Sequence, residues 1–262
     1  MKGRLMKRLI NFAASSLAAS SLAASSFTAL SLAAAPHAAA GRANGGRPAI
    51  HLAVSQAAQS PKGWSLTGSH REHYYLTTDG KVRHGGKTSA TLISKNSASD
   101  EGFGSMKQEI KADEYRGRRI RYSGYLKTER AAQRAALWMR VEGADGKILA
   151  FDNMEERPAT GTTSWKKYEI VLDVPEAAQH IALGAQFEGK GQIWADDLKL
   201  EVVGRDVAST DIQASPELKR ELEEADEEYR RTRKEEFERA LRQTKERLST
   251  MPARPVNFDF ES

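Results

Sequence analysis

Alternating apolar and polar positions predict a chain built mainly of β-strands. Leu137, Met139 and Val141 show the two-residue period of a strand that buries one face. The same alternation recurs from position 50 to position 203, with turn signals about every 8–15 residues. About ten or eleven strands without an intervening helix indicate an antiparallel jelly-roll β-sandwich. The main predicted strands are Ile50–Gln56, Tyr74–Asp79, Thr88–Ser94, Phe103–Ile110, Arg118–Thr128, Lys147–Met154, Tyr168–Val174, Ile181–Phe187 and Gln192–Val203, and a loop is predicted over Arg157–Trp165.

The stretch Ala135–Met154 predicts a central hairpin around Asp145 and Gly146. A loop with an even number of residues would place Asp152 on the apolar face as a buried, unpaired carboxylate. A three-residue loop, Ala144 to Gly146, places Leu149 and Phe151 on that face instead, and we expect this register. Trp138, Arg140 and Asp152 then share the opposite face.

The last predicted strand changes phase. Ile193 has one parity, whereas Leu198, Leu200 and Val202 have the other. The change falls at Asp196-Asp197 and predicts a β-bulge there.

A charged segment after position 215 predicts one long C-terminal α-helix, Pro216–Ser249, with ten basic and eleven acidic residues. Its apolar stripe is narrow and slips at Tyr229. It fits either a solvated helix lying partly on the sandwich or a coiled coil for self-association. The tail over 250–262 alternates Val256, Phe258 and Phe260, which predicts a short edge strand. That strand either completes this sandwich or begins a further domain.

The first forty residues predict an export signal. Four basic residues precede an Ala/Ser/Leu-rich stretch that ends in Ala38-Ala39-Ala40. We expect a flexible mature terminus over 41–48, the sandwich over 49–204 and a linker over 205–215. Without residues 1–40 the chain has 36 basic and 35 acidic residues, so its net charge of +1 gives no reason to expect nucleic acid.

Motifs for catalysis are missing from the sequence. There is no cysteine, no G-x-S-x-G, no H-E-x-x-H and no P-loop. We therefore expect a protein that is not an enzyme. From the export signal, we expect a periplasmic or secreted protein without a membrane span once the signal is removed.

An ordered set of motifs resembles a known bacterial module. The set is YRGRRIRYSGYLKTE, LWMRVEG, FDNM, GTTSW with YEIVLDVPE, and GKGQIWADDLKLEVV. It resembles galactose-binding-like, carbohydrate-binding-module-like β-sandwiches found beside erythromycin-esterase-like domains and in some proteins labelled transcriptional regulators. The resemblance implies a jelly roll that binds a ligand or glycan. It also implies a structural Ca²⁺ held through Asp196 or Asp197. No helix-turn-helix motif accompanies the match.

The candidate ligand-binding residues are aromatic side chains beside polar ones. Aromatic rings suit the apolar C–H face of a pyranose, and polar side chains orient its hydroxyl groups. In a competing interpretation, a neighbouring loop covers Trp138, and Arg140 belongs to a surface ion pair. The expected partner is a glycan or cell-envelope polymer; the alternative is a structural protein that uses the helix to bind itself or a protein partner. The candidates are Trp138, Tyr125 and Tyr74 for stacking, Arg140, Asp152 and Gln186 for hydrogen bonds, and Arg121 for a charged contact.

Overall fold

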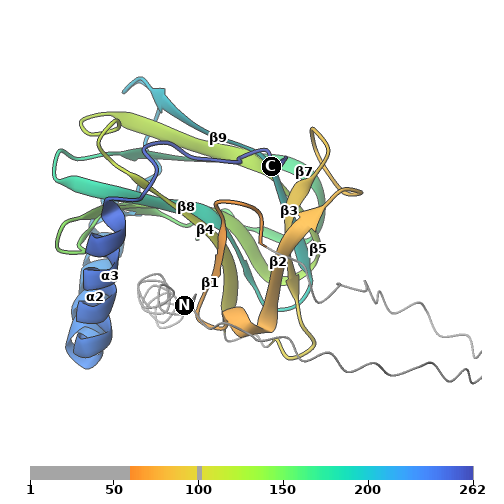
Figure 1. Cartoon of the computed structure of the whole chain (residues 1–262), viewed down its shortest axis with the longest axis horizontal. Coiled ribbons are helices and arrows are strands. Elements are labelled where there is room, and N and C mark those ends of the chain that lie inside the picture. The colour runs from red at the N-terminus through yellow and green to blue at the C-terminus, as the bar shows by residue number, and fades with distance from the viewer. Residues whose placement is uncertain (1–59, 99–101, 262) are drawn as a thin grey trace, which may run out of the picture.

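A computed structural model describes residues 60–98 and 102–261. The predicted signal over 1–40, the terminus over 41–48 and the strand Ile50–Gln56 lie outside these residues. Within them the chain forms nine strands followed by two α-helices, which confirms the predicted sandwich with C-terminal helical structure (Figure 1). The strands are β1 (Ser65–Thr67), β2 (Tyr74–Asp79), β3 (Ser89–Ser94), β4 (Phe103–Lys111), β5 (Arg119–Gly143), β6 (Ile148–Asp152), β7 (Ala159–Asp173), β8 (Ala178–Glu188) and β9 (Gln192–Val203).

The strands are hydrogen-bonded in the order β1-β4-β8-β5-β9-β3-β2, and β6 and β7 pair with the other edge of β5. All described pairs are antiparallel. The 25-residue β5 joins two layers. Its first half pairs with β9 and β7, and its second half pairs with β8 and β6. We call β2, β3, β9, β7 and the first half of β5 the first layer, and β1, β4, β8, β6 and the second half of β5 the second layer.

The inward face of β5 changes parity at Arg130, whose φ of 52° is left-handed. Ile120 and Tyr122 are buried before this point, and Leu137 and Met139 are buried after it. All four belong to one apolar core between the layers. Even-numbered side chains of the second half of β5 therefore point outward, away from the core.

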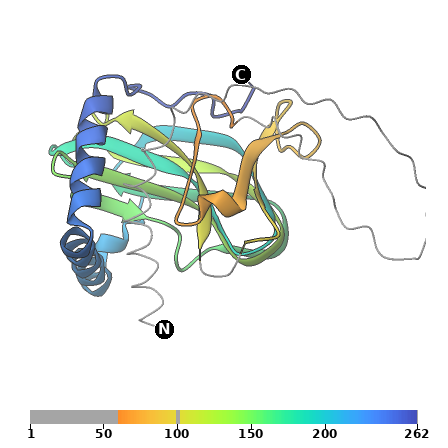
Figure 2. The ribbon, with the colours of Figure 1, turned by 60° about the horizontal axis from the view of Figure 1, so that its bottom comes forward.

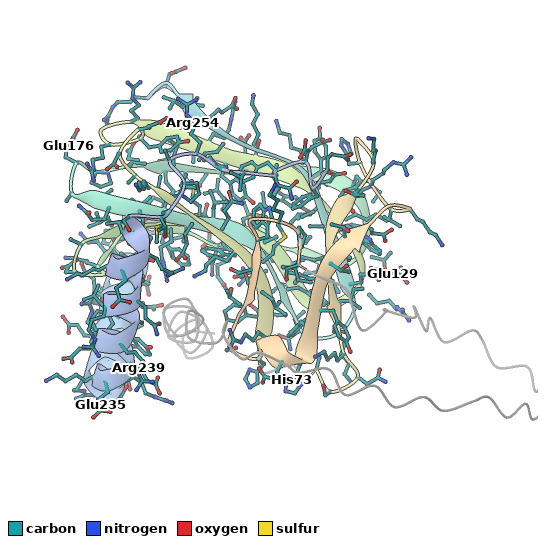
Figure 3. The ribbon with its side chains drawn as sticks, viewed as in Figure 1. His73, Glu129, Glu176, Glu235, Arg239 and Arg254 are labelled. Atoms are coloured by element: carbon teal, nitrogen blue, oxygen red, sulfur yellow. The ribbon has the colours of Figure 1, made fainter. Side chains whose placement is uncertain are left out.

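Two helices follow the sandwich, α2 (Pro216–Thr232) and α3 (Lys234–Leu248). The predicted single helix Pro216–Ser249 is wrong in this respect, because Arg233 has φ −126° and ψ 37° and breaks it. The break lies just after Tyr229, where the apolar stripe slips. The helices stand beside one end of the second-layer strands (Figure 2), and Glu235 and Arg239 mark their end away from the sheets (Figure 3).

The C-terminal tail closes the sandwich without forming the predicted edge strand. The described residues after Val203 contain no strand, but Phe260 is buried in the core and its ring centroid lies 5.6 Å from that of Trp64. The backbone carbonyl of Asn257 accepts a hydrogen bond from Trp64 Nε1 at 3.0 Å. Left-handed φ values at Asn257 and Phe260 interrupt the extended conformation that a strand needs.

The central hairpin has a different register from the predicted one. Arg140 lies opposite Phe151 and Met139 lies opposite Asp152, with a bulge between Val141 and Glu142. Phe151 is therefore on the outward face with Trp138, and Asp152 is on the inward side. The expected loop over Arg157–Trp165 is also wrong, since β7 begins at Ala159. The bulge predicted at Asp196-Asp197 is confirmed by the register shift of β9 against β5 and by the φ of 47° at Asp197.

Candidate functional site

The predicted ligand residues are distributed over three places. Trp138, Arg140 and Gln186 share the outward face of the second layer, because they alternate with core residues on β5 and β8. Tyr125 and Arg121 are on the outward face of the first layer. The remaining two candidates, Asp152 and Tyr74, are buried elsewhere.

Trp138 occupies the centre of the second-layer face. It lies opposite Gly184 of β8, and its Nε1 donates a hydrogen bond to Ser105 Oγ on β4 at 2.8 Å. A Cβ at Gly184 would come within 3.2 Å of that Nε1 and 1.8 Å of the Met106 carbonyl oxygen. Glycine at 184 therefore lets the indole reach across β8 to β4.

Polar side chains surround Trp138 on this second-layer face. Ser105 lies opposite Gln186, and Gln186 lies opposite Ala136. Gln186 is 2% exposed, and its Oε1 has no hydrogen-bond partner among the described residues. A buried amide oxygen without a donor is costly, typically about 1–3 kcal/mol. Sequence alternation over Phe103–Lys111 would have placed Ser105, Lys107 and Glu109 on this face, although they were not among the candidates.

Ion pairs complete the second-layer face at the end nearer α3. Arg140 pairs with Glu142, and His180 Nε2 lies 3.4 Å from the other oxygen of Glu142. Burial raises the pKa of Glu142, but Arg140 and His180 outweigh burial and hold the pKa at about 2. Glu142 is therefore anionic at neutral pH. This outcome agrees with the competing interpretation of Arg140 as an ion-pair residue, except that the pair is buried.

A second buried pair connects the second-layer face to α3. Lys107 Nζ lies 3.0 Å from Glu109 Oε1, and Arg247 of α3 donates to Glu109 Oε2 at 2.8 Å. Burial raises the pKa of Glu109, but Lys107, Arg247 and His180 together lower it to about 2. The carboxylate of Glu109 thus holds the end of α3 against the sheet.

Helix α2 covers the aromatic part of the second-layer face. Leu222 and Ala225 form one apolar cluster with Trp138, Phe151 and Ile148, separate from the main core. Trp138 is consequently 1% exposed. Leu222 and Ala225 of the apolar stripe therefore pack on the sandwich, whereas Tyr229 packs with Phe237 and Ala240 of α3.

Asp152 and Tyr74 have structural surroundings. Asp152 pairs with Arg157 and accepts the backbone N–H of Met154 at 2.7 Å, so this buried carboxylate is paired after all. Tyr74 packs edge-on against Phe187 and donates to the Gly102 and Gly189 carbonyls, each at 3.2 Å.

The two aspartates expected to hold Ca²⁺ are occupied by hydrogen-bond donors. Asp196 Oδ2 accepts the backbone N–H groups of His84 at 2.7 Å and Gly85 at 3.1 Å. Its Oδ1 accepts the backbone N–H of Asp197 at 2.8 Å. Burial raises the pKa of Asp196, while these donors lower it. N–H groups directed at both oxygens do not fit a cation ligand. No three acidic or histidine side chains among the described residues are grouped to hold a metal ion.

Tyr125 and Arg121 lie on the opposite side of the sandwich from Trp138. His84 stacks on Tyr125 with ring centroids 3.6 Å apart and planes inclined by 15°. Arg121 donates to Glu201 Oε1 at 2.8 Å. His84 was not a candidate, because its position in a loop 41 residues before Tyr125 gives no sequence signal of the stack.

Comparison with curated proteins gives two partial relatives. The chain is 44% identical over 157 residues to the uncharacterized HTH-type transcriptional regulator YbfP of Bacillus subtilis (strain 168), covering 60% of this chain and 53% of YbfP. It is 27% identical over 147 residues to the tRNA(Glu)-specific nuclease WapA of Bacillus subtilis subsp. natto (strain BEST195), covering 53% of this chain and 6% of WapA. The chain therefore spans about half the length of YbfP. No protein-family model matches it.

Carbohydrate-binding modules are among its structural neighbours. The CBM22-1 xylan-binding domain from Paenibacillus barcinonensis Xyn10C matches with a TM-score of 0.41 and 12% identity over 55% of this chain and 88% of that one. TmCBM61 in complex with β-1,4-galactotriose matches with a TM-score of 0.37 and 15% identity over 55% and 91%. The enzymatically active domain of bacteriophage CBA120 tailspike protein 4 matches with a TM-score of 0.44 and 17% identity over 55% and 20%. Likeness at these scores carries no information about a ligand.

None of the helices in the described part of the chain combines the length and the apolar character needed to span a bilayer.

Proposed function

We propose that this protein is an exported, non-catalytic carbohydrate-binding module whose ligand lies on the outward face of the second layer. The observation that carries the proposal is the environment of Gln186. Its Oε1 is buried without a hydrogen-bond donor among the described residues, on the strand next to that of Trp138, on a face that carries polar side chains. A sugar hydroxyl is a donor of the right kind for this oxygen.

The composition of the second-layer face suits a sugar. An indole offers an apolar plane to pyranose C–H groups, and fixed polar groups around it select the pattern of hydroxyls. Ser105 fixes the indole through its hydrogen bond to Nε1, so the ring is held in one orientation before binding. Arg140 and Glu142 are already paired with each other and would act mainly by setting the local charge.

Access to Trp138 requires α2 to move. Leu222 and Ala225 share a cluster with the indole, so ligand and helix compete for the same apolar surface. Burying a leucine side chain stabilises a contact by about 2–3 kcal/mol, an amount that binding of an extended glycan can offset. The proposed module therefore has a closed form, seen here, and an open form that binds.

The test is a binding screen of residues 41–262 against neutral and acidic polysaccharides and cell-wall fragments. The wild-type protein is compared with Gln186→Met, which removes the unpartnered oxygen while keeping the side-chain volume. The control is Gln179→Met, the same substitution at the start of the same strand. We expect saturable binding that weakens at least tenfold in Gln186→Met and persists in the control. Equal binding by all three proteins would refute the site, and no binding by the folded wild-type protein would refute the function.

A further inference from the structure

The outward face of the first layer carries a second, accessible aromatic cluster. His84 from the loop between β2 and β3, Tyr125 of β5 and Trp165 of β7 meet there. The ring centroids of Trp165 and His84 lie 5.7 Å apart, with planes inclined by 69°. His84 is exposed, and Tyr125 and Trp165 are partly exposed. Together the three rings form a partly exposed aromatic surface, which we call the aromatic corner.

This aromatic corner is held in place by the β9 bulge. Asp196 accepts the backbone N–H groups of His84 and Gly85, which ties the loop to β9. The Asp197 carboxylate oxygen Oδ2 lies 2.5 Å from His84 Nδ1. A Cβ at Gly85 would lie 2.7 Å from the Asp197 carboxylate, so this approach depends on glycine.

The contacts that hold His84 in place bury little of its side-chain surface. The His84 and Asp197 side chains keep 31% and 43% of their surface exposed, and Asp197 has a left-handed φ of 47°. Left-handed backbone at a residue other than glycine costs about 1 kcal/mol or more. Strain that fixes an exposed ring without burying it is typical of a surface prepared for a ligand.

Two lysines flank the aromatic corner. Lys167 lies directly opposite Tyr125 on the neighbouring strand, is exposed, and pairs with no carboxylate among the described residues. Lys127 is two residues beyond Tyr125 on the same face, with its ammonium 5.8 Å from the Trp194 ring. The carboxylate of the nearby Asp197 is already in contact with His84 Nδ1. The corner therefore offers a stacking surface next to cations.

We propose that the corner of His84, Tyr125 and Trp165 binds an acidic carbohydrate, a pyranose chain that carries carboxylate groups. The sugar ring stacks on the aromatic corner, and Lys167 and Lys127 contact the carboxylate. This site is separate from the proposed site on the second-layer face, so either site can be refuted by experiment without affecting the other. A flexible acidic peptide satisfies the lysines but lacks the ring that the aromatic corner fits.

The test uses two probes that differ only at C6 of each sugar ring, trigalacturonate and the neutral galactose trisaccharide with the same linkage. Titration of the full mature chain at low salt is expected to show trigalacturonate binding at least tenfold tighter than the neutral sugar. Trp165→Ala is expected to lose at least tenfold in affinity. Lys167→Gln is expected to weaken trigalacturonate binding about threefold to tenfold and to reduce its salt dependence.

Two controls separate the outcomes. Lys147→Gln, an exposed lysine in the β5–β6 turn, should leave binding unchanged. Gln179→Met, a substitution on β8 outside the proposed ligand contacts, should also leave it unchanged. Equal affinity for the two trisaccharides, full binding by a folded Trp165→Ala protein, no binding of trigalacturonate by the wild-type protein, or tighter binding of a glutamate tripeptide would each overturn the proposal. If Trp165→Ala does not fold, Lys167→Gln decides, because that side chain is exposed.

Discussion

The indole Nε1 of Trp138 donates a hydrogen bond to Ser105 Oγ at 2.8 Å, across the intervening strand β8. This contact connects the central hairpin to β4 and fixes the ring on the outward face of the second layer. Leu222 and Ala225 of α2 close over the same ring. The indole ring thus stabilises the closed form and is also part of the proposed site.

Trp138→Ala should therefore lower stability as well as binding. Replacing a fully buried tryptophan by alanine typically costs about 3–5 kcal/mol. Chemical denaturation should show a loss in this range, larger than that of Trp138→Phe, which keeps an aromatic ring in the cluster. Unchanged stability in Trp138→Ala would mean that α2 does not pack on the indole.

Acid should destabilise the protein through Glu109 and Glu142. Burial opposes ionisation of both, but neighbouring cations lower each pKa from 4.5 to about 2. A carboxyl group with a lowered pKa in the folded state stabilises above its unfolded pKa and loses that contribution as pH falls towards the folded value. The unfolding free energy should fall between about pH 5 and pH 2, by up to roughly 3 kcal/mol for each group.

Denaturant titrations at several pH values, compared between wild type and Glu109→Gln, measure this effect. The variant should be less stable at pH 7 and should show a shallower decline in acid. An identical decline in both proteins would show that Glu109 does not carry the acid dependence.

Arg157→Ala should destabilise the sandwich through Asp152. Asp152 is fully buried, and Arg157 is the cation that pairs with it. Removing the partner of a buried carboxylate typically costs about 3–5 kcal/mol, and we expect a smaller loss because Arg157 is partly exposed. Adding Asp152→Asn should restore part of the stability, since the uncompensated charge is then gone. Additive losses in the double variant would contradict a direct pair.

Strand positions were predictable because alternation marks them directly. Phe103–Ile110 and Gln192–Val203 were placed within one residue, and the bulge at Asp197 followed from the parity change. The hairpin register was mispredicted because Asp152 was treated as unpaired. Arg157 lies in the loop before β7, and the sequence does not reveal that it pairs with Asp152.

The candidate site could be predicted only in part. Trp138, Arg140 and Gln186 share a face, as their parity implies within each strand. Sequence could not show that α2 covers Trp138, because the cover depends on how α2 docks on the sheet. Nor could it bring His84 to Tyr125, since backbone hydrogen bonds to Asp196 position that loop.

In the proposed function, ligand and α2 compete for the second-layer face. The most direct test is titration of one polysaccharide selected by the screen against wild type, Leu222→Asp and Gln186→Met. Leu222 lies outside the main core, so Leu222→Asp should release α2 and leave the sandwich folded. Loss of a leucine contact worth about 2–3 kcal/mol should tighten binding about tenfold or more, if the closed form dominates. The account predicts tighter binding by Leu222→Asp and weaker binding by Gln186→Met. Unchanged affinity in both variants would contradict it.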